Sequence, residues 1–144
     1  MEKILQEKIS ADHLFYVSLK YTKTTDVILN LLEKWKNIIE ISLEKLLEKA
    51  KKKNIIKNIP HVPKMKIDVC KKIFKKNTNI IEAINLLEFL KKIPVIEKIR
   101  ENEFRKNVAV KILHKGEWIT IDIEKLEEYN EIIERFIREV KQFL

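Results

Sequence analysis

The sequence has 144 residues, of which 45% are hydrophobic and 36% are charged, and it contains one glycine and three prolines. This length and composition predict a single helical domain over residues 1–144, with enough apolar side chains for a core and almost no linker. The single Cys70 excludes an internal disulfide, and no apolar run approaches the roughly 20 residues of a membrane span. We therefore expect a cytoplasmic protein without a membrane segment.

The formal net charge is +8, and the basic charge is concentrated in one segment. Residues 49–76 hold eleven lysines and one acidic residue, Asp68. The enrichment in lysine and glutamate is also the compositional trend of proteins from thermophiles, although an AT-rich genome would favour lysine codons as well.

A pattern of apolar residues at alternating three- and four-residue steps begins near Ala11, with Ser10 as its predicted cap, and continues to Lys53. The phase of this pattern never breaks, which favours one helix about 64 Å long. The threonine-rich stretch 22–26 contains poor interior helix residues and favours a second helix that starts there. The sequence leaves both possibilities open.

Pro60 and Pro63 predict a loop, followed by a helix that begins at about Lys64 and has a basic outer side. Thr78 is the predicted cap of the next helix, which ends near Lys92 and has a broad apolar face. Such breadth indicates a central position in the bundle.

Pro94 predicts the start of a shorter helix over residues 95–107. A β-hairpin follows over residues 108–123, because the apolar residues alternate with period two around a Lys115-Gly116 turn. This register places three branched pairs on one buried face: Ile112 opposite Ile119, Val110 opposite Ile121, and Val108 opposite Ile123.

On the other face of the hairpin, Leu113 lies opposite Trp118 at the tip. Asp122 is the predicted cap of the last amphipathic helix. The predicted fold is therefore mainly α, a helical bundle with one inserted two-stranded β-hairpin before the last helix.

A concentrated basic segment suits an anionic polymer such as RNA, and the alternative is that these lysines are simply solvated. Because lysine lacks the planar fork of arginine, binding through this segment is expected to have weak sequence specificity. The candidate RNA-binding residues are Lys51, Lys52, Lys53, Lys57, Lys64, Lys71, Lys72 and Lys75.

No motif for metal binding or nucleophilic catalysis is present. The histidines His13, His61 and His114 have no histidine or cysteine at ligand spacing, and no serine lies in a strand-turn-helix elbow. We therefore predict no metal and no cofactor, and Cys70 is expected to be a core thiol.

The segment RENEFRKNVAVKI and the order of the elements resemble the HEPN-like superfamily, whose members are commonly dimeric helical bundles that often cleave RNA. The motif of that family is an arginine followed, after four to six intervening residues, by a histidine. From Arg100 the histidine positions fall on residues 105–107, and from Arg105 they fall on residues 110–112, so His114 comes too late. The resemblance therefore implies a degenerate, non-cleaving member, because the usual proton donor and acceptor is missing.

The leading hypothesis is a non-catalytic, HEPN-like binding protein for RNA or for a protein partner. One alternative is a ribonuclease of a toxin or defence system, in which Arg100 or Arg105 works with a histidine reached through the fold or the dimer, His114 being the first candidate; another is a structural homo-oligomer. The resemblance implies a homodimer and, for a toxin-like system, a nucleotidyltransferase-type antitoxin as partner. Leu113 and Trp118 are the candidate interface, unless the loop Lys53–Pro63 covers them within one chain.

Overall fold

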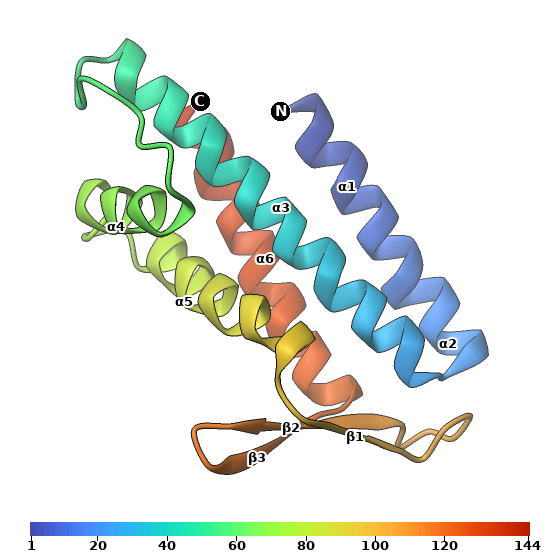
Figure 1. Cartoon of the computed structure of the whole chain (residues 1–144). Helices are drawn as coiled ribbons and strands as arrows, with labels where there is room; N and C mark the ends of the chain where they lie inside the picture. The colour runs from blue at the N-terminus through green and yellow to red at the C-terminus, as the bar shows by residue number, and fades with distance from the viewer.

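The computed structural model describes residues 1–144 and consists mainly of helices, with a small antiparallel sheet at one end (Figure 1). The helices are α1 (Glu2–His13), α2 (Leu19–Thr22), α3 (Thr25–Lys52), α4 (Pro63–Ile73), α5 (Thr78–Lys92) and α6 (Ile123–Phe143). The strands are β1 (Lys98–Glu101), β2 (Ala109–His114) and β3 (Glu117–Ile121). A π-helical turn, Leu14–Ser18, joins α1 to α2, and a 3₁₀ turn, Ile93–Val95, follows α5. None of the helices combines the length and the apolar character that a membrane span requires.

The first helical segment starts earlier than the sequence predicts. Ser10 lies inside α1 rather than capping it, because buried apolar positions continue upstream to Ile4. The chain then reverses at Lys23, whose φ is 48°, and the hydroxyl of Thr24 accepts a hydrogen bond of 3.3 Å from the amide of Val27. Residues 11–52 therefore form two helical segments: one runs from α1 through the π-helical turn to α2, and the other is α3, which begins in the threonine-rich stretch.

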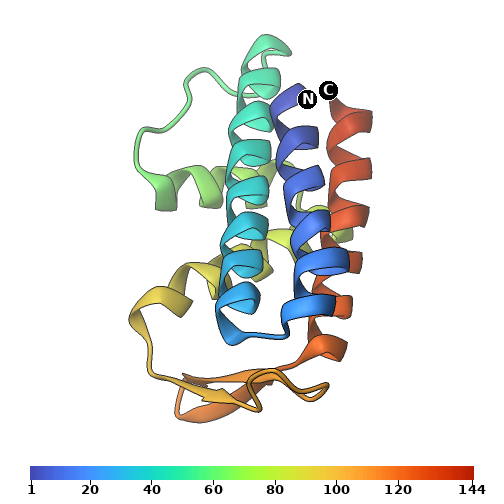
Figure 2. The ribbon, with the colours of Figure 1, turned by 90° about the vertical axis from the view of Figure 1, so that its right-hand side faces the viewer.

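α3 is the helix around which the bundle is built, since it packs against α1, α4, α5 and α6. Its buried side includes Trp35, which is completely enclosed. Thirty-one buried residues, drawn from every helix and from β2 and β3, form one hydrophobic cluster, so the chain folds around one core. Figure 2 shows α1, α3 and α6 side by side, with both termini at one end and the sheet at the other.

α4 lies across the bundle and begins at Pro63, one residue before the predicted start. α5 ends at Lys92 as predicted, but its cap is Asn77 rather than Thr78. Asn77 has an extended backbone, and its side-chain oxygen accepts a hydrogen bond of 3.2 Å from the amide of Ile80. The predicted cap of α6 is correct, because the carboxylate of Asp122 accepts from the amide of Lys125 at 2.9 Å.

The predicted helix over residues 95–107 is wrong. In its place the chain makes the 3₁₀ turn, strand β1 and a loop. β1 pairs antiparallel with β2, so that Arg100 lies opposite Val110. This pairing covers an edge of β2 that a two-stranded hairpin would leave open, and such tertiary pairing overrides local helix preference.

The predicted hairpin register is confirmed for two branched pairs, since Ile112 lies opposite Ile119 and Val110 opposite Ile121. The third predicted pair lies outside the ladder, because β2 begins at Ala109 and β3 ends at Ile121 to let α6 start. Val110, Ile112 and Ile121 are fully buried against the end of the bundle. The sheet therefore closes one end of the core (Figure 1).

The loop between β1 and β2 is fixed to the start of α3. The carboxylate of Glu103 accepts hydrogen bonds from the Thr25 amide, at 3.2 Å and 3.3 Å, and from the Thr25 hydroxyl. Arg100 donates to that hydroxyl at 2.8 Å and to the carboxylate of Asp26 at 2.6 Å, and this hydrogen bond raises the pKa of Arg100. Because Thr25 is fully buried, its polar groups need these partners.

The substitution Glu103→Gln should lower the free energy of unfolding by about 1 to 3 kcal/mol, since it weakens charge-assisted hydrogen bonds to a buried residue. Urea denaturation followed by circular dichroism measures this change. The matched control is Glu117→Gln at the exposed start of β3, which should change stability by less than about 0.5 kcal/mol. Equal effects of the two substitutions would contradict the role assigned to Glu103.

Candidate functional site

The lysines of residues 49–76 lie in the half of the molecule away from the sheet (Figure 1). They come from the last turns of α3, the loop 53–62, α4 and the turn that leads into α5, which are the green segments of Figure 1. Two of them are ion-paired: Lys66 with Glu44 at 2.8 Å, and Lys71 with Glu88 at 2.6 Å. Lys71 is therefore the one predicted RNA-binding residue whose charge is compensated by a carboxylate.

The remaining predicted residues have no carboxylate within 4.0 Å. The ammonium of Lys53 lies 4.4 Å from the centre of the Phe143 ring, so this lysine also fastens the end of α3 to α6. We refer to the exposed, unpaired set as the lysine surface: Lys51, Lys52, Lys53, Lys57, Lys64, Lys72, Lys75 and Lys76.

Exposed apolar side chains lie between these lysines. Ile55, Val62 and Met65 are each about half exposed, and His61 is exposed in the same loop. Aliphatic side chains cover surface but do not stack on bases as aromatic rings do. The lysine surface therefore suits contacts with phosphate groups rather than base-specific recognition.

The structure does not bring the predicted catalytic residues together within one chain. Arg100 is bound to Thr25 and Asp26, and Arg105 is exposed in the loop after β1. His114 ends β2, with its ring 5.3 Å from the ring of Phe89. Because Arg100 lies opposite residue 110, it is about 13 Å along the sheet from His114.

Cys70 is a core residue, as predicted. It is completely buried in α4, and burial, with a smaller effect of Glu44, raises the pKa of its thiol to about 12. The thiol is therefore protonated at neutral pH and is no nucleophile. The chain also contains no cluster of three or more histidine, cysteine or acidic side chains that could hold a metal ion.

The predicted pair at the hairpin tip is confirmed: Leu113 lies opposite Trp118, and Trp118 is 44% exposed. Ile99 is exposed on the same face of the sheet, because it lies opposite Lys111, two residues before Leu113. The loop 53–63 lies at the opposite end of the molecule (Figure 1), so the alternative that this loop covers the pair is wrong.

Sequence reasoning missed two sets of residues. Glu103 and Thr25 are 78 residues apart, and nothing local marks them as partners. The second set surrounds Asn130, which is only 6% exposed and donates a hydrogen bond of 3.0 Å to the Tyr16 hydroxyl. The sequence does mark this residue, because the polar Asn130 interrupts the apolar stripe of α6 between Leu126 and Ile133.

Trp118→Ala should lower the mass of any oligomer in sedimentation velocity while changing thermal stability little, since the Trp118 side chain is already half in solvent. Glu117→Ala, an exposed position on the other face of β3, is the matched control and should leave the mass unchanged. The interface prediction fails if the mass is unchanged, or if the substitution costs the roughly 3 to 5 kcal/mol typical of a core tryptophan.

Comparison of the chain with protein-family models, with curated proteins and with solved structures found no match. The HEPN-like resemblance therefore stays a prediction. Function has to be argued from the side chains described above rather than from kinship.

Proposed function

We propose that the protein is a non-catalytic helical binding protein and that its lysine surface binds RNA. One observation carries this proposal: eight exposed lysines lie in the half of the molecule away from the sheet, and no carboxylate lies within 4.0 Å of any of them. The acidic residues Glu44 and Glu88, which could neutralise them, are engaged with Lys66 and Lys71 instead. An uncompensated basic surface gains free energy when it releases the counterions of a polyanion.

The chemistry of these residues defines the kind of binding. Each lysine is a strongly hydrated point charge on a flexible stem, which contacts phosphate without fixing its orientation. The half-exposed Ile55, Val62 and Met65 add apolar contact between the charges. We therefore expect binding of single-stranded or structured RNA with little sequence preference.

Three features of the chain support the non-catalytic part of the proposal. The guanidinium of Arg100 is used to hold α3, His114 lies far along β2 from it, and the Cys70 thiol is buried and protonated. A HEPN-like relation belongs to the same proposal, supported by a β excursion that lies between α5 and the last amphipathic helix. The face of Leu113 and Trp118 is the proposed contact for a second copy or for an antitoxin-type partner.

Replacing Lys51, Lys52 and Lys57 with glutamine should weaken RNA binding and flatten its salt dependence. Each phosphate contact with a single strand contributes about 0.7 to the log-log slope, so the slope should fall by about 2 in the triple variant. Fluorescence anisotropy with a labelled single-stranded RNA, measured across salt concentrations, gives this slope.

The matched control replaces three exposed lysines that carry no ion pair and lie outside the lysine surface: Lys3, Lys92 and Lys106. It removes the same net charge, so a slope that falls equally in both variants would show general electrostatic attraction and contradict a defined surface. Lys53 is left unchanged because its contact with Phe143 contributes to the fold.

The purified protein should leave RNA intact, because the positions of the motif histidine after Arg100 and Arg105 hold other residues. Incubation with labelled RNA and gel analysis measures cleavage. Should RNA be cut, and should Arg105→Ala and His114→Ala each abolish cutting while thermal stability is retained, the ribonuclease alternative replaces the non-catalytic proposal.

A further inference from the structure

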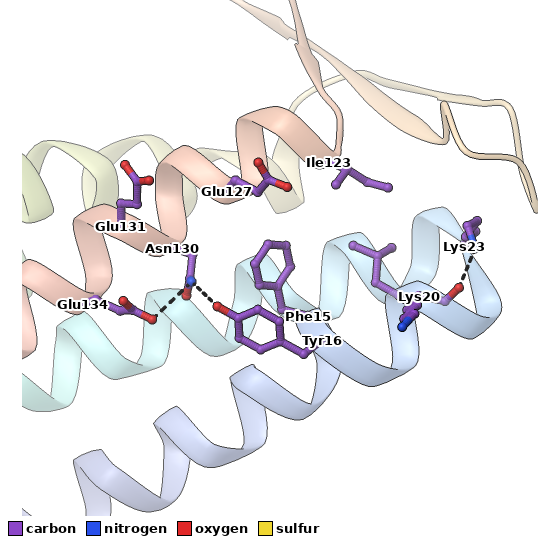
Figure 3. Close-up of a pocket in the computed structure, with 10 residues that line it drawn as sticks. Phe15, Tyr16, Lys20, Lys23, Ile123, Glu127, Asn130, Glu131 and Glu134 are labelled. Carbon is purple, nitrogen blue, oxygen red and sulfur yellow. Dashed lines mark hydrogen bonds between the residues drawn. The ribbon is translucent and has the colours of Figure 1, made fainter.

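A cleft of about 580 Å³ lies between the π-helical turn and α6, on a side of the molecule that the proposed RNA binding does not use (Figure 3). Phe15, Leu19 and Ile123 supply its apolar lining, and Tyr16 lies beside Asn130 (Figure 3). This size lies within the range of pockets that hold small organic ligands. The π-helical turn that shapes it is a rare element, often found at functional sites.

The side chain of Asn130, which lines the cleft, has a buried oxygen without a hydrogen-bond donor. The carboxylate of Glu134 only accepts hydrogen bonds, so the amide atom 3.3 Å from it is the Asn130 nitrogen, which also donates to the Tyr16 hydroxyl at 3.0 Å. The Asn130 oxygen is therefore turned away from both, and it is buried without any donor. A buried acceptor without a donor costs free energy, which a ligand with an N–H group would recover.

The charges around the cleft indicate that this donor is a cation. Glu127, Glu131 and Glu134 line the α6 wall at spacings of four and three residues, so they share one side of the helix. Lys8 contacts Glu134 at 3.5 Å but is also bound to Asp12, Arg135 lies 4.0 Å from Glu131 but is bound more closely to Glu82 at 2.7 Å, and Glu127 has no ion pair. An ammonium group near Asn130 would be attracted by these carboxylates.

The other end of the cleft limits the ligand to one positive charge. Lys20 and Lys23 line that end, and neither forms an ion pair with any carboxylate. A second ammonium group would be repelled there, while an apolar body fits over Phe15 and Leu19. Polyamines are therefore poor ligands for this site.

We propose that this cleft binds a small ligand with one protonated primary amine on an apolar body, the amine donating to the side-chain oxygen of Asn130 and facing the carboxylates of Glu131 and Glu134. The Asn130 oxygen is buried, so the proposal requires the side chain of Tyr16, which is 55% exposed, to shift when the amine binds. The site is independent of the lysine surface, which lies on other elements.

The test titrates phenethylamine, which is protonated at neutral pH, into the full-length protein and follows binding by calorimetry and by the NMR signals of the Asn130 amide. N-acetylphenethylamine has the same apolar body without the charge, and it should bind at least tenfold more weakly. Spermidine should also bind more weakly than phenethylamine. Equal affinities for the charged and acetylated compounds, tighter binding of spermidine, or no binding of phenethylamine at millimolar concentration would overturn the proposal.

Two substitutions test where the amine of the ligand lies in the cleft. Glu131→Gln removes an exposed carboxylate of the cleft and should weaken phenethylamine binding severalfold, whereas Glu128→Gln, outside the cleft on the same helix, should not. Asn130→Leu should reduce binding about tenfold, because it removes the unpaired oxygen but keeps the side-chain volume. If the leucine variant is poorly folded, the comparison of the two glutamate variants decides alone, and equal affinities would contradict the assigned position.

Discussion

The architecture depends on how the start of α3 is held. The amide and hydroxyl of Thr25 are buried there, and both hydrogen-bond to Glu103, from the loop after β1. Arg100 completes the arrangement by bridging Thr25 and Asp26. Negative side chains at this position also complement the helix dipole. Because the other long helices pack on α3, this contact links the strand β1 and its loop to the central helix of the bundle.

The same helix connects the two ends of the molecule. Its first turn is fixed against the sheet, whereas its last turn presents Lys51 and Lys52 to solvent. Lysines at a helix C-terminus are stabilised by the negative end of the dipole, so this helix favours a positive surface there. Because these lysines are exposed, the positive surface requires no burial of charge in the core.

The two proposed binding regions differ in the charged side chains that they present. The lysine surface lies around the end of α3, while carboxylates of α6 line the cleft beside the π-helical turn. A polyanion is attracted to the first region, and a small cation to the second. The two proposed ligands therefore do not compete for the same side chains, and failure of one proposal leaves the other standing.

Local signals in the sequence predicted the features that depend on near neighbours. The hairpin register follows from period two around Gly116, the start of α4 from Pro63, and the start of α6 from the Asp122 cap. Strand β1 could not be predicted in this way, because its four residues are ordered by pairing with β2 rather than by their own preference.

The same contrast between local and long-range signals applies to the candidate sites. The lysine surface could be predicted because eleven lysines in one segment are visible as charge; the structure removes the ion-paired Lys71 from the predicted set and adds the exposed Lys76. The cleft could not, because Tyr16 and Asn130 are 114 residues apart and the π-helical turn leaves no simple pattern. The role of Arg100 was also hidden, since its partners belong to another helix.

The central claim, that RNA binds at the end of α3 and along α4, is tested most directly by chemical footprinting of lysines. The protein is acetylated briefly with and without a single-stranded RNA, and the modification of each lysine is measured by mass spectrometry. The account predicts that RNA slows acetylation of Lys51, Lys57 and Lys64, while Lys3 and Lys106 react as before. Uniform protection of all lysines, or protection confined to those outside the lysine surface, would contradict it.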